Sequence, residues 1–192
     1  MNEATCSPFL PDWFKPSALL YMRHEAIDPQ FFVRNRERLL ENLKPNSLVV
    51  IHANDIFPTN ADGTMAFRQN NDLFYLTGID QEETVLILSP DAVLEEDRAI
   101  LFVRETSEQI AIWEGEKLTK EQATEASGMK NIQWVDAFES AFRRLALQAE
   151  NIYLHTNEYV AASEIVETRN RRFIRRCQEL YPLHNYERVA VP

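Results

Sequence analysis

The sequence predicts an α/β fold in which a mixed β-sheet is flanked by helices. Short apolar runs rich in β-formers alternate with amphipathic segments of helical period through the second half of the chain. Of the 192 residues, 45% are hydrophobic, which is enough for one well-formed core. The four glycines are scattered, so the clustered-glycine loops that cradle phosphates in nucleotide-binding folds are absent.

Two segments of different character divide the chain. Residues 1–27 are irregular and punctuated by prolines, and they carry the aromatic residues Phe9, Trp13 and Phe14. This is too many aromatic side chains for a free tail, so we expect an N-terminal arm that packs on another surface. Residues 28–192 form the single domain in which the strands and helices alternate.

Charge and cysteine content limit the possible partners and location. The formal net charge is −10, from 30 acidic and 20 basic residues, which disfavours binding to a phosphate backbone. No apolar run approaches the roughly 18 residues that span a bilayer. The N-terminus lacks the pattern of a signal peptide. Cys6 and Cys177 form no CxxC pair, so we expect reduced thiols, a cytoplasmic location, and neither nucleic acid nor membrane as a partner.

The first half of the domain predicts one helix and three strands. Asp28 can cap a helix whose first turn accepts Pro29, and this helix should end before Pro45. A polar, turn-rich loop spans residues 54–64. The apolar runs predict strands at 48–52, 84–89 and 98–103, with a hairpin or loop at 91–98.

The second half predicts further helices and strands in alternation. A capping box of Thr119 and Gln122, with Gly128 at the C′ position, bounds one helix. Asp136 and Glu139 resemble a second cap. The remaining expectations are a helical turn at 106–113, strands at 132–135 and 151–156, helices at 136–149 and 157–181, and a terminal strand or connector at 185–192.

The sequence contains no recognisable catalytic or metal motif. The histidines are widely separated, although His52 and His155 each end an apolar strand where a sheet could bring them together. The carboxylate runs at Glu82–Glu83 and Glu95–Asp97 occupy turn positions and are read as solvated charge. Trp113 is read either as core or as the flat wall of a pocket.

A cluster of arginines lies on the last predicted helix. Nucleic acid could bind it, but the overall acidity favours ion pairs to an acidic subunit or a neighbouring domain. The cluster comprises Arg169, Arg171, Arg172, Arg175 and Arg176.

One stretch, FRQNNDLFYLTGIDQEETVLIL, resembles the signature of the N-terminal domain of Xaa-Pro aminopeptidase (aminopeptidase P), in the proline-peptidase and creatinase family. The segments FFVRNRERLL, IWEGEKLT and NIYLHTNEY are also similar to that family, and the resemblance covers about Phe31 to Pro192. The signature positions are Phe67, Arg68, Gln69, Asp72, Phe74, Tyr75, Thr77, Gly78, Glu83 and Val85 to Leu88.

The resemblance implies a ribonuclease-H-like fold and a part in a metallo-aminopeptidase. The whole enzyme releases the N-terminal residue that precedes proline, through two divalent metals, usually manganese, in a pita-bread C-terminal domain. The metal ligands of the family are two Asp, one His and two Glu in that second domain. We expect that C-terminal domain to be absent from this chain. We therefore assign neither catalytic nor metal-binding residues to these 192 residues, and we expect the chain to be inactive alone.

The resemblance also implies what the domain contributes. In the family it mediates dimers or tetramers and walls the cleft for peptide substrates. Trp113 matches a tryptophan that lines this cleft, and Asp62 matches an acidic residue that reaches the entrance of a neighbouring active site. The partners expected are therefore the chain's own catalytic domain, a homodimer or homotetramer, and peptides.

Two alternatives remain open. The chain could be a stand-alone binding or regulatory module that retains the fold without peptidase activity. A ribonuclease-H-like nuclease would need carboxylates at strand ends to hold magnesium, for which Asp55 and Asp80 are possible.

We expect the signature itself to be mainly structural. Phe74 and Tyr75 should pack into the core with help from Leu73 and Leu76, and Gly78 should end the turn where a side chain would not fit. Arg68 and Asp72 could pair if the turn is helical. Gln69 and Asn70 should satisfy backbone groups of the adjoining loop.

Overall fold

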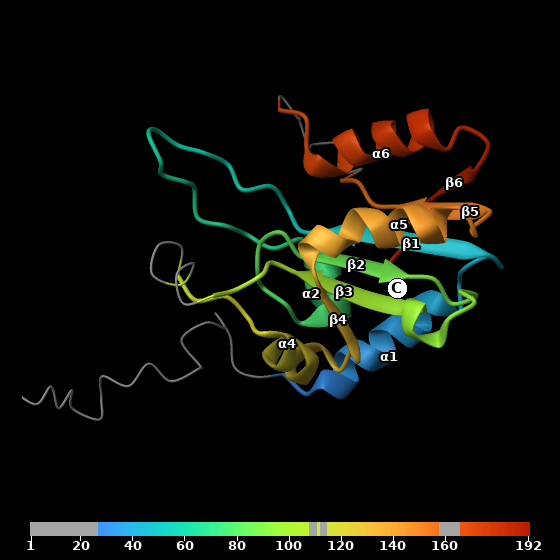
Figure 1. The fold of residues 1–192 in the computed structure, drawn as a ribbon, viewed down its shortest axis with the longest axis horizontal. Helices are drawn as coiled ribbons and strands as arrows, with labels where there is room; N and C mark the ends of the chain where they lie inside the picture. The colour runs from blue at the N-terminus through green and yellow to red at the C-terminus, as the bar shows by residue number, and fades with distance from the viewer. Residues whose placement is uncertain (1–26, 108–110, 112–114, 158–165) are drawn as a thin grey trace, which may run out of the picture.

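A six-stranded mixed sheet forms the centre of the protein in the computed structural model, which describes residues 27–107, 111, 115–157 and 166–192 (Figure 1). The strand order is β4-β3-β2-β1-β5-β6. Strand β2 is antiparallel to β1 and to β3, and the remaining neighbours are parallel. The strands are β1 Ser47–His52, β2 Val85–Leu88, β3 Ala99–Val103, β4 Asn131–Trp134, β5 Asn151–Leu154 and β6 Asn185–Arg188. The predicted α/β class is therefore confirmed.

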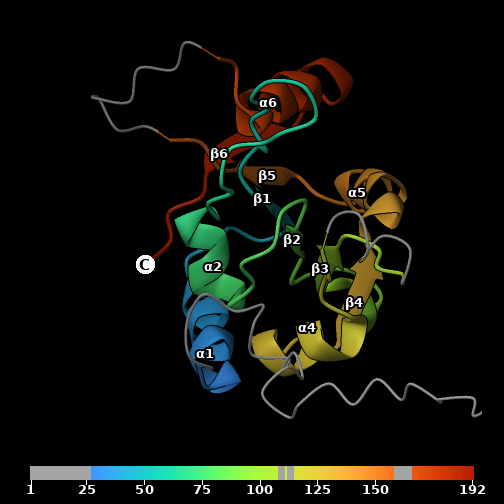
Figure 2. The same cartoon turned by 90° about the vertical axis from the view of Figure 1, so that its left-hand side faces the viewer.

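Helices cover both faces of this sheet (Figures 1 and 2). One face carries α1 Pro29–Leu40, α2 Asn71–Thr77 and α4 Lys120–Ser127. The other face carries α5 Phe138–Ala146 and α6 Arg169–Leu180. All six residues of β1 are buried, because successive side chains point alternately into the two helical layers.

Most local predictions for the chain agree with the structure. The capping box of Thr119 and Gln122 is formed at the start of α4. Strands β2 and β3 are joined as an antiparallel hairpin through a short 3-10 helix, Glu95–Asp97. The N-terminal arm, apart from Ile27, and most of the predicted helical turn at 106–113 lie outside the described residues. Within the described part, no helix is long and apolar enough to cross a membrane.

Two predicted helix starts are wrong. Helix α6 begins at Arg169 with Thr168 as its N-cap, whereas the pattern predicted a start at Asn157. Helix α5 has Ala137 at its N-cap position and no side-chain capping bond there. Glu139, predicted to complete that cap, instead bonds to Arg176 on α6 with oxygen-to-nitrogen distances of 2.5 and 2.6 Å. A long-range ion pair therefore replaces the local interaction.

Helix α1 holds the carboxyl-terminal ends of α2 and α4 through one buried arginine. The guanidinium of Arg36 donates to the carbonyl oxygen of Leu76 at 2.6 Å and to that of Ser127 at 3.0 Å. Arg36 is only 7% exposed, and its burial lowers the pKa of its guanidinium to about 10. A cation at two helix carboxyl ends is favourable because both dipoles and both free carbonyls point at it.

The same two helices end in glycines with left-handed backbone conformations. Gly78 ends α2 at φ +70° and Gly128 ends α4 at φ +67°. A Cβ at Gly78 would lie 2.3 Å from Cε2 of the buried Phe32 ring. The prediction that Gly78 occupies a position with no room for a side chain is therefore confirmed.

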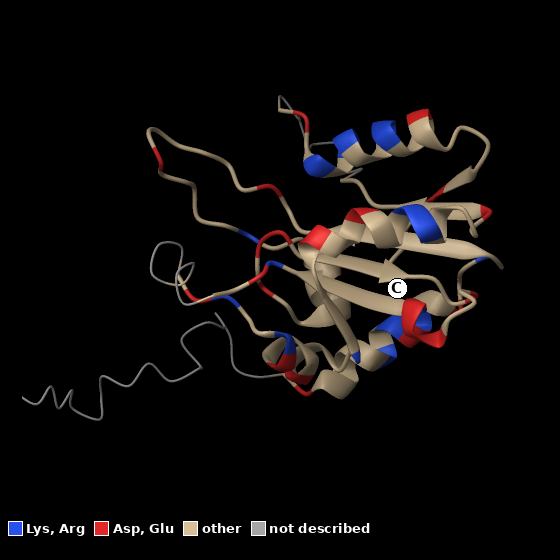
Figure 3. Cartoon of the chain, viewed as in Figure 1, with Lys and Arg blue, Asp and Glu red and all other residues tan. Residues whose placement is uncertain are grey.

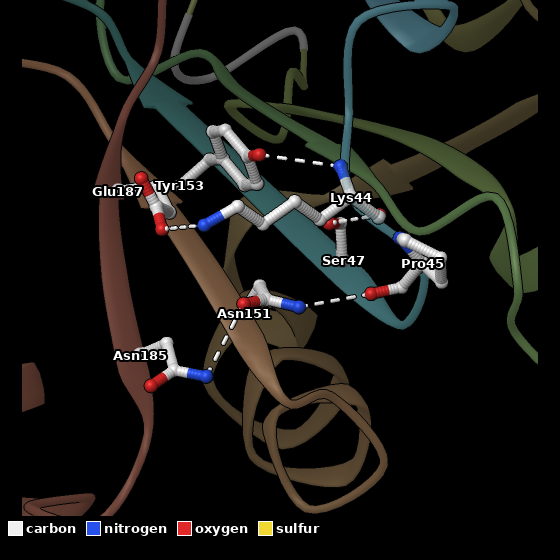
Figure 4. A network of polar contacts seen from close by, with 7 residues as sticks. All are labelled: Lys44, Pro45, Ser47, Asn151, Tyr153, Asn185 and Glu187. Atoms are coloured by element: carbon white, nitrogen blue, oxygen red, sulfur yellow. Dashed lines mark hydrogen bonds and ion pairs between the residues drawn. The ribbon is translucent and has the colours of Figure 1, made fainter.

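Polar contacts fix the opposite edge of the sheet, where β1, β5 and β6 begin (Figure 4). The side-chain amide of Asn151 donates to the carbonyl oxygen of Pro45 at 2.9 Å, and that of Asn185 donates to Asn151 at 3.3 Å. Lys44 forms an ion pair with Glu187, and its backbone N–H donates to the Tyr153 hydroxyl at 3.2 Å. These contacts set the register in which three segments distant in sequence lie side by side.

Candidate functional site

The signature stretch folds as helix α2 with the segment that caps it. The side-chain oxygen of Asn70 accepts from the backbone N–H groups of Asp72 and Leu73 at 2.9 and 3.3 Å. Leu73 and Leu76 are fully buried, whereas Phe74 and Tyr75 are half-buried. The prediction gave the main core role to the two aromatic residues, whereas the structure gives it to the two leucines. The leucines face the sheet, and the aromatic rings pack on α1.

Gln69 links the start and the end of this stretch. Its side-chain amide donates to the carbonyl oxygens of Ile79 and Gln81 at 3.1 and 2.8 Å, and its oxygen accepts from the backbone of Asn70 at 2.8 Å. The expectation that Gln69 and Asn70 satisfy backbone groups is confirmed. These bonds close a loop of about a dozen residues around α2.

The predicted pairing of Arg68 with Asp72 does not occur. Helix α2 begins at Asn71, so Arg68 precedes the cap and the two side chains are not stacked on one helical face. Asp72 instead lies 2.5 Å from Nε2 of His155, and the amides of Asn70 and Asn170 contact Nδ1 of that ring at 3.3 Å each. Among the described residues, the exposed guanidinium of Arg68 has neither an ion pair nor a side-chain hydrogen bond.

This histidine joins three elements, and sequence reasoning placed it only at a strand end. His155 follows β5, Asp72 lies on α2 and Asn170 lies on α6. A cavity of about 500 Å³ opens beside them at the carboxyl ends of β1 and β5. Polar groups of Arg68 and His155 line it together with the apolar side chains of Phe57 and Met65.

Residues 57–65 form a projecting hairpin (teal in Figure 1), and Asp62 lies in its turn. An antiparallel bridge joins Pro58 to Thr64, and the backbone N–H of Met65 donates to the carbonyl oxygen of Phe57 at 2.8 Å. Asp62 is exposed in the turn, while Phe57 and Met65 expose 40% and 59% of their surfaces nearer the sheet. The hairpin therefore presents a carboxylate and two large apolar side chains to its surroundings.

Helix α6 carries a row of arginines, visible in Figure 3, that is largely neutralised within the domain. Arg172 pairs with Asp55 at 2.6 Å, Arg175 with Glu167 at 2.6 Å and Arg176 with Glu139 at 2.5 Å. The expectation that these three side chains pair with another subunit or domain is corrected, since their carboxylate partners belong to this chain.

His52 is a core residue that the sequence left undecided. Its ring is 5% exposed and lies at centroid distances of 5.4 Å from Phe138 and 4.4 Å from Phe173. Burial, followed by the positive charge of Arg169, lowers the pKa of His52 to about 3, so the ring is neutral at physiological pH. Cys177, read as an apolar filler, is buried in the same core, and burial raises the pKa of its thiol to about 12.

Trp113, the second residue assigned to a substrate cleft, lies outside the described residues. Of the two residues assigned to the cleft, the structure therefore describes only Asp62. Among the residues that the structure describes, no group of three or more His, Cys, Asp or Glu side chains is arranged to hold a metal ion.

We compared the chain with known protein families and solved structures. Its architecture is a mixed sheet with a capped signature helix and a projecting hairpin. Residues 32–153 match the family described as aminopeptidase P, N-terminal domain. The chain belongs to this family. All the signature positions quoted above, from Phe67 to Leu88, lie inside the matched range.

Named relatives agree with this assignment. The chain is 30% identical over 144 residues to the Xaa-Pro aminopeptidase of Escherichia coli, covering 74% of this chain and 32% of that protein. A Bacillus anthracis structure assigned to aminopeptidase P superposes with a TM-score of 0.75 at 25% identity, covering 85% of this chain and 38% of that one. Pseudomonas aeruginosa aminopeptidase PepP shares the fold, with a TM-score of 0.68 at 22% identity over 86% of this chain and 37% of that one. The chain thus spans about a third of the length of these relatives.

Proposed function

We propose that this chain is the non-catalytic N-terminal domain of a Xaa-Pro aminopeptidase, an enzyme that releases the N-terminal residue preceding proline. The observation that carries the proposal is the family match over residues 32–153 in a chain that covers only a third of its named relatives. Its role is to assemble the enzyme as a homodimer or homotetramer and to wall the cleft that receives peptide substrates. The proposed location is the cytoplasm.

The projecting hairpin supports the cleft-wall role. Asp62 stands clear of the domain on a turn that backbone hydrogen bonds hold, and a charged group in that position can reach a neighbouring surface. Phe57 and Met65 supply exposed apolar area at the base of the hairpin, which suits burial against another domain or subunit. A carboxylate placed at the mouth of a cleft would attract the free amino terminus of a peptide.

The proposed metal site lies in a further domain. The described residues supply no suitable ligand cluster, so we assign the two divalent ions, manganese in our proposal, to the catalytic domain that follows in the whole enzyme. Two such ions would generate a hydroxide nucleophile and stabilise the tetrahedral intermediate. This chain's own residues would position and restrict the peptide.

Two other functions remain as outcomes of the test. A stand-alone binding module would keep the fold and the hairpin without a catalytic domain. A nuclease is disfavoured by Asp55, whose carboxylate accepts from the backbone of Arg169 and the guanidinium of Arg172, both at 2.6 Å. A carboxylate occupied in this way has little capacity left for magnesium.

The first experiment compares the 192-residue chain with the product of the complete gene. Both are incubated with a Xaa-Pro-Xaa tripeptide and Mn²⁺, and release of the first residue is measured. We expect activity only in a product with a second domain that contains the Asp, Asp, His, Glu, Glu ligand set. A gene that ends after Pro192 would instead favour the stand-alone module.

The second experiment tests the cleft residues in the complete enzyme. Asp62→Asn and Trp113→Ala are each expected to lower kcat/KM for Xaa-Pro peptides while leaving the melting temperature nearly unchanged. Glu121→Gln on the exposed surface of α4 is the matched control for charge loss. A large drop in melting temperature for Trp113→Ala would identify that tryptophan as core and contradict its assignment to the cleft.

A further inference from the structure

A second cavity, of about 320 Å³, lies where the carboxyl end of β1 meets helices α5 and α6. Its apolar walls are the rings of Phe138 and Phe173 with the side chains of Val85 and Val135. It shares only Arg169 with the larger cavity beside His155, and it has no part in the function proposed above.

One largely buried histidine, His52, lines this cavity and makes no hydrogen bond to another described residue. His52 is 95% buried by the 5% exposure of its surface, and neither of its ring nitrogens has a hydrogen-bond partner among the residues that the structure places. Because its pKa lies far below neutrality, the ring is uncharged and keeps one N–H donor and one acceptor. The only fully buried side-chain nitrogen or oxygen without a partner among the described residues is Nε2 of Gln81, so the His52 nitrogens are reached from the cavity rather than sealed in the core. A ligand in the cavity can therefore meet a neutral imidazole that no described protein group already occupies.

Most charged side chains that line this cavity form ion pairs within the described part of the chain, and one arginine does not. Arg172 pairs with Asp55, and Arg176 pairs with Glu139. Glu83 lies 3.2 Å from the guanidinium of Arg104. The remaining arginine of the cavity, Arg169, has a guanidinium without an ion pair or hydrogen bond in the described part of the chain.

Arg169 is also the first residue of α6, so its guanidinium stands at the positive end of the helix dipole. Its backbone N–H already donates to Asp55, and Arg169 lines both this cavity and the one beside His155. Its positive charge lies close enough to His52 to help lower the pKa of that ring, and the other charges of this cavity are paired. The cavity therefore combines one uncompensated positive charge, one neutral imidazole and an aromatic wall.

We propose that this cavity binds a carboxylate attached to a short apolar body. The guanidinium of Arg169 pairs with the carboxylate, His52 provides a hydrogen bond, and Phe138 and Phe173 receive the apolar body. Such a group could be a free small carboxylic acid or the apolar C-terminal residue of a peptide, which present the same chemistry.

The test titrates the 192-residue chain with benzoate and with benzamide, which has the same ring but no charge. Binding is followed from the imidazole NMR signals of His52 and from the signals of the probe. We expect saturable shifts with benzoate and none with benzamide. N-acetylleucine and its amide form a second pair, and tighter binding of N-acetylleucine than of benzoate would assign the site to a peptide C-terminus, whereas the reverse order would assign it to a free acid.

Variants separate the site from general charge effects. Arg169→Gln should weaken benzoate binding by at least about tenfold, as the loss of a charge-assisted hydrogen bond does. Arg175→Gln removes the same charge from a residue that pairs with Glu167 away from the cavity, and it should leave affinity unchanged. His52→Phe should also weaken binding, and if it does not fold, Arg169→Gln decides alone.

Three results would overturn the proposal. One is the absence of saturable binding by either carboxylate. Another is equal affinity for benzoate and benzamide, which would show that the charge is not recognised. The third is an equal effect of Arg169→Gln and Arg175→Gln, which would reduce the effect to the overall charge of the helix.

Discussion

Substitution of Gly78 by alanine tests how α1 and α2 are packed. The backbone at Gly78 has φ +70°, where a residue with a Cβ is strained by about 1–2 kcal/mol. The new methyl group would also lie 2.3 Å and 2.5 Å from two carbons of the Phe32 ring. Phe32 is 2% exposed and cannot move into solvent, so overpacking adds about 1–3 kcal/mol. The expected total loss of unfolding free energy is about 2–5 kcal/mol.

Gly128→Ala is the matched control because it shares the conformation without the aromatic clash. Gly128 also ends a helix, at φ +67°, but its nearest neighbour would be the tip of Val33 at 2.9 Å. A small shift of that side chain relieves the contact, so the expected loss is the backbone strain of about 1–2 kcal/mol alone. The difference between the two variants measures the contact with Phe32.

The assay is urea unfolding followed by circular dichroism, with thermal melting as a second measurement. Each kcal/mol lowers the melting temperature of a domain of this size by about 2–4 °C. A Phe32→Leu background should reduce the additional loss caused by Gly78→Ala, because the ring atoms that clash are gone. If Gly78→Ala is no more destabilising than Gly128→Ala, the close packing of α1 on this glycine is refuted.

Three further substitutions probe other contacts. Arg36→Met should lower the unfolding free energy by about 2–4 kcal/mol, since the carbonyls of Leu76 and Ser127 lose a charged donor, and a loss below about 1 kcal/mol in urea unfolding would contradict this. The pKa of His52 falls from its ordinary value of about 6.5 to about 3 on folding, so its contribution to stability is complete above pH 6.5 and is lost as the pH falls towards 3. Urea unfolding should show about 2 kcal/mol less stability at pH 5 from this group, a loss that His52→Phe should abolish and that an unchanged pH dependence would disprove. Thr119→Ala should cost about 1 kcal/mol by removing the capping box of α4, and equal melting temperatures would show that the cap is dispensable.

Local patterns in the sequence were sufficient for the strands and for several helix ends. Apolar runs located β1 to β5 within one or two residues, whereas β6 ends four residues before the end of the predicted segment at 185–192. The capping box at Thr119 and the glycine at 128 set the limits of α4. Such signals succeed because the groups that form them lie within a few residues of one another. The start of α6 was misplaced because Asn157 and Thr168 are both competent caps, and periodicity alone does not choose between them.

The candidate sites depend on contacts that local patterns do not contain. His155 was visible as a strand-end histidine, but its contact with Asp72 joins positions 83 residues apart. Arg68 was expected to be the partner of Asp72 across one helical turn. Helix α2 begins only at Asn71, so Arg68 lies outside the helix and the two side chains do not share a helical face. The sequence offered one signal for this contact, namely a histidine at the end of a predicted strand and an Asn that can cap a helix containing Asp72.

By itself, the sequence determined the family, the alternation of strands and helices, and the structural role of the signature around Gly78. These properties follow from residue order, backbone conformation and side-chain period, all of which act over short distances. Only the tertiary structure decided that Arg36 binds two helix ends, that three arginines of α6 are neutralised inside the domain, and that His52 stays uncharged at the wall of a cavity. Those outcomes depend on which distant groups meet and how completely water is excluded, since burial and charge partners set the electrostatic state of each side chain.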